Sequence, residues 1–436
     1  MTVSEVALRR RGWPVVVACA AGLLLSGSPV QASAGVQASA GVQASAAPLT
    51  PDGLPGPQPG CPPQHGIAAP AAEPWAQQAL RFASIWNRTR GGGVTVAVVD
   101  SGVDANPQFG DRVIPGPDLV AGKAPRIPPG ADCVGHGTAV ASIIAAAPMP
   151  GVSFTGVAPA ARILSVKISG TDTFPTSAAP QGIMDAVQFG ADVINLSLAT
   201  TDDVPDLRNA VEYALRRNVV VVAAAGNDSQ QGGGAQGHEG VEGSGPFYPA
   251  AYPGVLAVGA AAPGGALAGF SDRRTPVAVT APGVNVTSAY PGTFPDAYAP
   301  AQSGTSFASA FVAGVAALVR SAHPGLSAAQ VVARIEATAH GPAGPGTGHG
   351  LVDPVRAVTA VLAAESGAAS TGSASTGSAS TGSASTGSTS TGAAGASAGT
   401  GTVAVIAGSF GLVVVVAAAV LAVFAVRRRR SGRHAR

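Results

Sequence analysis

One histidine of the chain stands where proton transfer could occur. Of seven histidines among 436 residues, only His136 opens an apolar stretch, and it does so between Gly135 and Gly137. Flanking glycines let a second backbone or a substrate approach closely. Such a histidine could act as a general base if a carboxylate orients it and a hydroxyl supplies the proton. The chemistry therefore requires two partners from other parts of the chain.

Asp100 is the carboxylate best placed to orient His136. It ends the apolar run Val94–Val99, and the carboxyl ends of parallel strands are where α/β proteins place their sites. A turn or a helix cap is the alternative role for such a residue. We assign that role to Asp104, which follows four residues later.

Ser306 is the hydroxyl best placed to act as a nucleophile. It precedes the uncharged stretch Phe307–Val319, which we expect to be a buried helix. The positive end of that helix would favour an anion at Ser306. The 13 residues of the stretch reach about 20 Å, too short to cross a bilayer. Ser303 and Ser309 are rivals, although Ser309 lies one turn inside the helix and suits a packing role better.

Asn227 could donate hydrogen bonds to negative charge that develops on a reacting oxygen. The run Val219–Ala225 predicts a buried strand, and Gly226 and Asn227 follow it. The alternative is a turn residue that tolerates unusual backbone angles. The glycine-rich loop 226–245 also holds Glu239 and Glu242. We interpret both as solvated charges rather than metal ligands, because no ligand spacing in the chain indicates a metal.

An α/β domain over residues 75–364 must position these groups. Its apolar runs are continuous and β-branched, which is typical of a mostly parallel sheet covered by helices on both faces. The expected strands are Val94–Val99, Arg162–Val166, Val193–Leu196, Val219–Val222 and Val255–Val258. The expected helices lie near residues 136–147, 179–190, 206–217, 306–321 and 327–339.

Residues 1–46 are typical of a secretory signal peptide with repeated cleavage sites. Arg9-Arg10-Arg11 precedes the apolar run Val15–Leu25, and the hexad VQASAG then recurs. Each copy offers an A-x-A site, so three cleavage points stay open, after Ala34, Ala40 or Ala46. Residues 47–74 form a proline-rich N-terminal extension that can be neither a helix nor a central strand.

The C-terminal part predicts a membrane anchor. Residues 365–402 are a linker of low complexity, rich in Ala, Ser, Thr and Gly. Residues 403–426 are apolar or small, and these 24 residues reach about 36 Å, enough to span a bilayer as a transmembrane helix. The basic tail 427–436 would lie in the cytoplasm. We therefore expect a single-pass protein of the plasma membrane with its domain outside the cell.

Charge and cysteine content narrow the class of protein further. Charged residues make up 11% of the chain and the net charge is +2, which argues against nucleic acid as a partner. Cys19 lies in the signal peptide, which leaves Cys61 and Cys133 as one pair in an exported protein. That pair predicts a disulfide bond.

Four motifs, in order and spacing, resemble those of the subtilisin-like serine proteases, or subtilases. They are Asp100-Ser101-Gly102-Val103-Asp104, Gly135-His136-Gly137-Thr138, Ala224-Ala225-Gly226-Asn227 and Gly304-Thr305-Ser306-Phe307-Ala308. The resemblance covers about residues 75–362 and implies the subtilisin-like three-layer fold. It departs at Ala310, where the family usually has proline; we expect a less rigid helix start and no loss of activity. We interpret Ala310, Ala313 and Gly314 as close packing of a buried helix.

The resemblance implies an endopeptidase with a Ser-His-Asp triad formed by Asp100, His136 and Ser306. Ser306 Oγ would attack the scissile carbonyl while His136 takes its proton and Asp100 holds the imidazole tautomer. Asn227 and the Ser306 N–H would bind the oxyanion. We expect no cofactor.

The resemblance also implies residues that bind the substrate. Ser197 and Leu198 would pair with the substrate backbone, and Ala225 and Gly226 would form a wall of the specificity pocket.

The order of segments resembles the mycosins, the membrane-anchored proteases of bacterial type VII secretion systems. In mycosins the N-terminal extension wraps the catalytic domain. This implies exported proteins or peptides as substrates and a type VII membrane complex as a partner. Two functions are compatible with it: an active endopeptidase, and a structural subunit for which catalysis is dispensable. An adhesin on a stalk would have no need of the four motifs.

Overall fold

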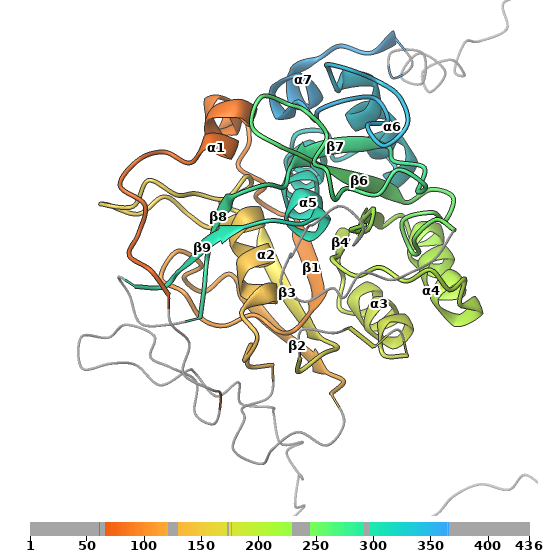
Figure 1. The fold of residues 1–436 in the computed structure, drawn as a ribbon, viewed down its shortest axis with the longest axis horizontal. Coiled ribbons are helices and arrows are strands. Elements are labelled where there is room, and N and C mark those ends of the chain that lie inside the picture. The colour runs from red at the N-terminus through yellow and green to blue at the C-terminus, as the bar shows by residue number, and fades with distance from the viewer. Residues whose placement is uncertain are drawn as a thin grey trace, which may run out of the picture. The chain divides into compact units, whose positions relative to one another are not determined.

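The computed structural model describes residues 61, 66–120, 130–171, 174–175, 177–228, 245–291, 296–363 and 365 (Figure 1). All of them belong to one compact unit, Met1–Ala369, and the second unit is Ser370–Arg436. The predicted signal peptide, most of the linker, the transmembrane helix and the cytoplasmic tail lie outside the described residues.

A seven-stranded parallel sheet forms the centre of the domain (Figure 1). Its strands are β1 (Thr95–Asp100), β2 (Val113–Asp118), β3 (Arg162–Lys167), β4 (Val193–Leu196), β5 (Val220–Ala224), β6 (Leu256–Ala261) and β7 (Val279–Pro282). Their order across the sheet is β2-β3-β1-β4-β5-β6-β7. A separate antiparallel pair joins β8 (Val286–Ala289) to β9 (Tyr298–Gln302).

The five central strands are those predicted from the sequence, and the two edge strands were not predicted. β2 contains Pro115, Gly116 and Pro117, a composition that predicts a turn. Proline lacks the N–H that a central strand must donate on one side, so an edge strand is where a sheet tolerates it. β7 is short and ends at Pro282, and its place at the opposite edge has the same explanation.

Helices cover both faces of the sheet and create three layers (Figure 1). Along β1, Val96 and Val98 belong to the core that includes the helices α2 and α5, whereas Ala97 and Val99 belong to the core on the other face. This alternation follows from the two-residue period of a strand. The long helices are α2 (His136–Ala145), α3 (Ala179–Gln188), α4 (Pro205–Arg216), α5 (Thr305–Ala322) and α6 (Ala328–Thr338).

Three short helical segments complete the described fold. They are α1 (Trp75–Leu80), a 3-10 helix (Phe82–Ile85) and α7 (Pro354–Thr359). The segment before α1 lies against the β8–β9 pair, because Ile67 exchanges backbone hydrogen bonds with Tyr298 at 2.7 and 3.2 Å. The described end of the N-terminal extension is therefore fixed to the domain surface.

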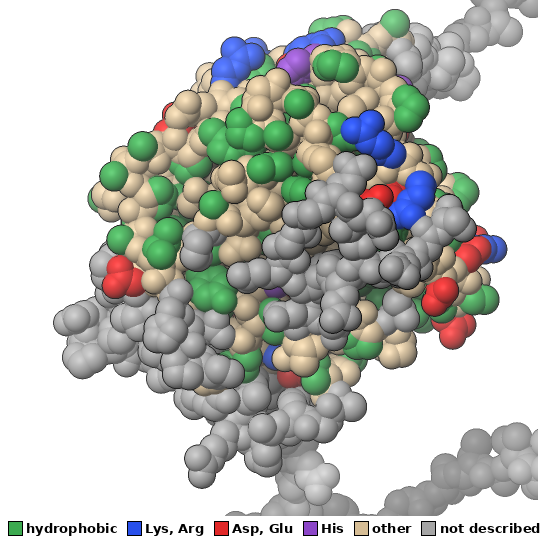
Figure 2. Space-filling view, viewed as in Figure 1, with side chains coloured by type: hydrophobic (Ala, Val, Ile, Leu, Met, Phe, Trp, Pro, Cys, Tyr) green, Lys and Arg blue, Asp and Glu red, His purple; other side chains and the backbone are tan. Residues whose placement is uncertain are grey.

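Charges are sparse on the face of the domain seen in Figure 2. Among the described residues drawn there, Lys and Arg side chains are scattered between neutral ones and do not join into a stripe. This agrees with the low charge content of the chain, 11%. A surface of this kind offers little attraction to a phosphate backbone.

Candidate active site

The polar groups singled out in the sequence lie at the carboxyl edge of the central strands. β1 has β3 on one side and β4 on the other, so the chain winds in opposite directions from β1. Parallel sheets place ligand sites beside such a switch point. Asp100 is the last residue of β1, His136 is the first residue of α2, and Ser306 is the second residue of α5.

Asp100 and His136 form a buried hydrogen-bonded pair. His136 Nδ1 lies 2.7 Å from Asp100 Oδ1, and the side chains are 11% and 0% exposed. The same carboxylate oxygen accepts the main-chain N–H of Ser101 at 2.8 Å. Since a carboxylate oxygen can only accept here, Nδ1 carries the ring proton and Nε2 is the basic nitrogen.

Glycine is required on both sides of His136 for this pair to form. A Cβ on Gly137 would lie 2.0 Å from the carbonyl oxygen of Gly102 and 3.2 Å from Asp100 Cβ. A Cβ on Gly135 would lie 2.2 Å from the ring of Tyr290, and Gly135 has φ +89°. The prediction that these glycines allow a close approach is confirmed.

Two aromatic rings lie beside the imidazole of His136. The centroids of Phe307 and Phe174 each lie 5.4 Å from that of His136. Phe307 follows Ser306 directly in α5, so its contact brings the start of α5 to the imidazole. Ser306 is 3% exposed, and its hydroxyl donates to the carbonyl oxygen of Ser197 at 3.3 Å.

Two buried hydroxyls hold the backbone of Ser306, and a buried asparagine holds one of them. The hydroxyls of Ser197 and Ser309 both donate to the carbonyl oxygen of Ser306, at 3.2 and 2.8 Å. Asn195 Nδ2 donates to Ser197 Oγ at 2.8 Å. Ser309 therefore has the packing role expected of it, while Ser197 has an internal contact that sequence reasoning did not anticipate. Ser303 takes a different part, since its hydroxyl accepts the N–H of Asn285 at 2.9 Å.

Asn227 lies at the start of α5. Its Oδ1 accepts both the N–H and the hydroxyl of Thr305 at 3.0 Å. A Cβ on Gly304 would lie 3.6 Å from Asn227 Nδ2, so the amide nitrogen lies beside the turn that leads into Ser306. Thr305 also accepts the N–H of Gly226 at 3.3 Å. Thr305 belongs to one of the four motifs, but its bridging role between Gly226 and Asn227 was not predicted.

The residues expected to bind the substrate follow β4 and β5. Leu198 is 2% exposed and belongs to the core. Ala225 is fully buried; its N–H donates to Val258 and its carbonyl accepts the Thr275 hydroxyl. Gly226 has φ +102°, and a Cβ there would lie 2.4 Å from the ring of Phe247. Both segments thus end at the same sheet edge as Asp100, Leu198 two residues beyond β4 and Ala225 directly after β5.

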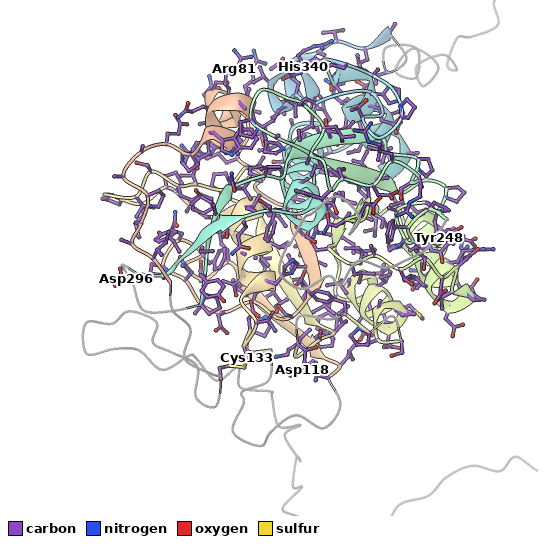
Figure 3. The ribbon with its side chains drawn as sticks, viewed as in Figure 1. Arg81, Asp118, Cys133, Tyr248, Asp296 and His340 are labelled. Carbon is purple, nitrogen blue, oxygen red and sulfur yellow. A yellow bond between two sulfur atoms is a disulfide. The ribbon has the colours of Figure 1, made fainter. Side chains whose placement is uncertain are left out.

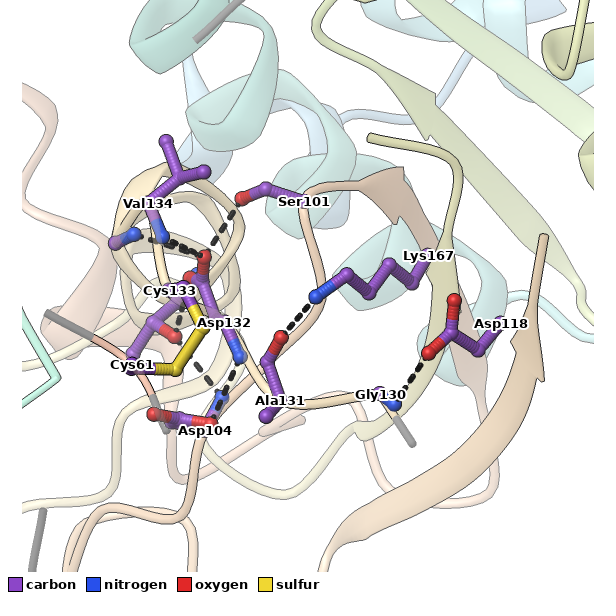
Figure 4. The surroundings of a disulfide bond; sticks show 12 residues. Cys61, Ser101, Asp104, Asp118, Gly130, Ala131, Asp132, Cys133, Val134 and Lys167 are labelled. Carbon is purple, nitrogen blue, oxygen red and sulfur yellow. Dashed lines mark hydrogen bonds between the residues drawn. A yellow bond between two sulfur atoms is a disulfide. The ribbon is translucent and has the colours of Figure 1, made fainter. Parts of the chain in front are cut away.

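Cys61 and Cys133 form a disulfide bond, the pairing expected from the sequence (Figures 3 and 4). Their Cα atoms are 5.0 Å apart, and 72 positions separate them in the chain. Cys133 precedes His136 by three residues. The proline-rich extension is therefore attached covalently to the loop that leads into α2.

Asp104 does not cap a turn or a helix, and that prediction is wrong. Its Oδ1 accepts the N–H of Asp132, 28 residues later, at 2.9 Å (Figure 4). Burial, together with the nearby carboxylate of Asp132, raises the pKa of Asp104 to about 7, and Lys167 opposes the shift. A turn is recognised from local sequence, whereas this contact joins two segments that are distant in the chain.

No group of three His, Cys, Asp or Glu side chains within the described ranges is arranged to hold a metal. Glu239 and Glu242 lie outside the described residues, as does most of the loop 226–245.

Comparison with known proteins places this geometry in a family. The model of the subtilase family, peptidase S8, matches residues 91–377. Mycosin-3 of Mycobacterium tuberculosis is 34% identical over 343 residues, which cover 67% of this chain and 73% of the relative. Subtilisin E of Bacillus subtilis is 39% identical over 257 residues, covering 57% and 61%.

A solved structure agrees with these relatives. It is that of the serine protease MycP1, described as an essential component of the type VII (ESX-1) secretion system. It has a TM-score of 0.56 and 34% identity, and the match covers 71% of this chain and 97% of that one. The chain belongs to the subtilase family and has its subtilisin-like α/β fold. It is a subtilisin-like serine endopeptidase, a hydrolase of peptide bonds, and it is similar to the mycosins.

Proposed function

We propose that this chain is a membrane-anchored, mycosin-type endopeptidase that hydrolyses exported proteins with Asp100, His136 and Ser306 as its triad. The observation that carries the proposal is the 2.7 Å bond between His136 Nδ1 and Asp100 Oδ1. It lies at the sheet edge where α5 begins, with Ser306 as the second residue of that helix. Among the described residues, the other pair of a histidine with an aspartate is His340 with Asp353, which are 3.6 Å apart and whose imidazole is 48% exposed.

The chemistry follows from these contacts. Nε2 of His136 takes the proton of Ser306 Oγ as that oxygen attacks the carbonyl carbon of the substrate. Ser306 Oγ leaves its resting contact with the carbonyl of Ser197 to do so. The Nδ2 group of Asn227 and the N–H of Ser306, at the positive end of α5, bind the oxyanion. The imidazolium then gives its proton to the leaving amine, and water hydrolyses the acyl-enzyme by the same steps.

Substrate binding is assigned to the segments beyond β4 and β5. The backbone around Ser197 and Leu198 would pair with an extended peptide, and Ala225 and Gly226 would form a wall of the pocket. Phe247 lies directly behind Gly226, which supports a wall that is rigid rather than adaptable.

The segments around the domain are assigned as the sequence predicts. Residues 1–46 direct export, residues 47–74 form the extension, and 75–364 form the peptidase domain. Residues 365–402 are a tether, 403–426 a transmembrane helix and 427–436 a cytoplasmic tail. The domain therefore acts outside the cell at the plasma membrane. Because the relative MycP1 is described as a component of a type VII secretion system, we place this chain in an assembly of that class.

A fluorophosphonate probe tests the triad, because it phosphonylates an activated serine nucleophile and leaves ordinary serine hydroxyls unmodified. We expect stoichiometric labelling of the full-length protein in detergent and none of the variant Ser306→Ala. Ser321→Ala is the matched control, since it removes a serine hydroxyl from the far end of the same helix, where it donates to Gly92, and should still be labelled. A folded wild-type protein that stays unlabelled would refute the assignment.

Complementation separates catalysis from a structural role in the assembly. In a strain that lacks this chain, Ser306→Ala should leave protein export defective if hydrolysis is required. Restoration of export by Ser306→Ala would show instead that the folded subunit suffices. The membrane level of each variant must be equal for the comparison to count.

A further inference from the structure

A buried carboxylate near His136, that of Asp132, takes no part in the triad. It is fully buried and receives five hydrogen bonds (Figure 4). Oδ1 accepts the hydroxyl of Ser101 at 2.8 Å and the N–H groups of Val134 and Gly135 at 3.1 and 2.8 Å. Oδ2 accepts the N–H and the hydroxyl of Thr138 at 2.8 and 2.7 Å. Val134, Gly135 and Thr138 flank His136 in the chain, so the carboxylate fixes the first turn of α2.

The Ser101 hydroxyl connects the carboxylate of Asp132 to the chain segment that directly follows Asp100. Ser101 Oγ lies 2.8 Å from Asp132 Oδ1 and 3.2 Å from Asp100 Oδ1. A hydroxyl has one proton, and the shorter contact to Asp132 is the better hydrogen bond. The oxygen of the same hydroxyl accepts the N–H of Gly137 at 2.9 Å. Ser101, which follows Asp100, is therefore hydrogen-bonded to Gly137, which follows His136.

The Thr138 hydroxyl makes a second link of the same kind. It donates to Asp132 Oδ2 and accepts the N–H of Asp104 at 2.9 Å. Asp104 in turn accepts the N–H of Asp132. The loop after β1 and the start of α2 are thus joined twice through the carboxylate of Asp132. The four residues of this network are at most 6% exposed: Ser101, Asp104, Asp132 and Thr138.

We propose that Asp132 is a positioning residue of the peptidase reaction, which sets the alignment of His136 with Asp100 through Ser101 and Thr138. The inference rests on the proposed function, because it takes these two side chains as base and orienting acid. Asp132 would act without touching the substrate. A loss of its carboxylate leaves donors buried without an acceptor and lets α2 shift against β1.

The charges around the network determine the sign of the expected pH effect. Three carboxylates lie in or beside the network: Asp100 ends β1, Asp104 follows β1, and Asp132 precedes α2. The nearby positive group is Lys167 of β3, whose ammonium donates to the carbonyl oxygen of Ala131. Removal of the negative charge of Asp132 makes an imidazolium at His136 less favourable. The acid limb of the pH–rate profile should then move to lower pH, by about 0.5 to 1 unit for a charge several ångströms away.

The test measures the rate and the end point of fluorophosphonate labelling of the full-length protein between pH 5 and 9. The variants are Asp132→Asn, Thr138→Val and Thr138→Ser. Asp185→Asn is the control, since it removes a carboxylate on α3 that accepts a hydrogen bond from Gln181. The end point counts competent sites, so the rate for each competent site is independent of how much protein is folded.

For Asp132→Asn we expect a rate per site lowered about 10- to 100-fold, with the acid limb shifted to lower pH. Thr138→Val should lose several-fold, whereas Thr138→Ser, which keeps the hydroxyl, and Asp185→Asn should stay within about twofold of the wild type. A wild-type rate and acid limb for Asp132→Asn would overturn the proposal, as would a reduced end point alone.

If Asp132→Asn does not fold, the threonine pair decides. Equal rates for Thr138→Val and Thr138→Ser would overturn the proposal. A wild-type protein labelled no better than Ser306→Ala would instead refute the proposed function, so the two failures are distinguishable.

Discussion

The substitution Gly137→Ala should separate the imidazole of His136 from the carboxylate of Asp100 without removing either group. The new methyl carbon would lie 2.0 Å from the carbonyl oxygen of Gly102 and 3.2 Å from Asp100 Cβ. Contacts of a Cβ below 3.0 Å are essentially unknown, so the two segments must move apart by about 1 Å. Gly102 has little room to retreat, because it packs closely against the carbonyl of Gly130.

The magnitude follows from the geometry. A displacement of about 1 Å stretches the 2.7 Å contact between His136 Nδ1 and Asp100 Oδ1 beyond the usual limit of about 3.2 Å for a hydrogen bond. A misplacement of this size costs about 100-fold in rate. The overpacking itself should destabilise the fold by about 1–3 kcal/mol, which a domain of this size survives.

The assay is the rate of fluorophosphonate labelling for each competent site, with the melting temperature measured alongside. Gly325→Ala is the matched control, because a Cβ there meets no atom within 4 Å; it should label and melt like the wild type. A wild-type labelling rate for Gly137→Ala would refute the reasoning. So would a loss of labelling that only follows a loss of folded protein.

Three other perturbations have outcomes fixed by the contacts above. Asn227→Ala should lower the labelling rate about 10²–10³-fold, the loss that removal of the oxyanion donor causes in subtilisin itself, and should lower the melting temperature by a few degrees, because the N–H and the hydroxyl of Thr305 lose their acceptor. Replacement of Cys61 and Cys133 by serine opens a loop of 72 residues, which should cost about 4 kcal/mol and about 10 °C in a thermal melt. Asp104→Asn should be most stabilising at high pH. The raised pKa of Asp104, about 7 in the fold against 3.8, means that folded protein holds a proton that the unfolded chain has lost between these values. Wild-type stability attributable to Asp104 is therefore present below about pH 4 and falls by about 1.4 kcal/mol per pH unit up to about pH 7. Melting temperatures of the two proteins that stay equal from pH 4 to pH 8 would refute that pKa.

The central strands and the helices of the domain could be predicted because their signals are local. Five β-branched runs, each too apolar for an edge, fall on β1 and β3 to β6. β2 was missed because it contains Pro115 and Pro117, which have no N–H to donate and therefore argue against a strand. An edge strand tolerates proline because one of its sides is unpaired. The edge position itself depends on how distant strands pair, which no short window of sequence contains.

The same contrast separates the parts of the site that were found from those that were missed. His136 stands between two glycines, which indicate a close approach, and Asp100 ends a run of residues that predicts a buried strand. Asp132 stands before Cys133 in a stretch that looks like a turn. The groups that donate hydrogen bonds to its carboxylate belong to Ser101, Val134, Gly135 and Thr138. The only signal available was a second aspartate shortly before the histidine, and polar residues that precede a helix usually cap it.

Helix α5 explains why apolar composition alone could not separate a membrane span from a core helix. The expected stretch of 13 residues is part of a helix of 18, Thr305–Ala322, which at about 27 Å is the one described helix long and apolar enough to cross a membrane. Yet 15 of its residues are buried in the domain. A helix covered on every side must be apolar on every side. Its small residues serve the same packing, since a Cβ on Gly314 would lie 2.6 Å from Val157 Cβ, and Ala310 continues the helix without interruption. Burial of residues 305–319 keeps water from the start of the helix, where the N–H of Ser306 would act on negative charge that forms beside it.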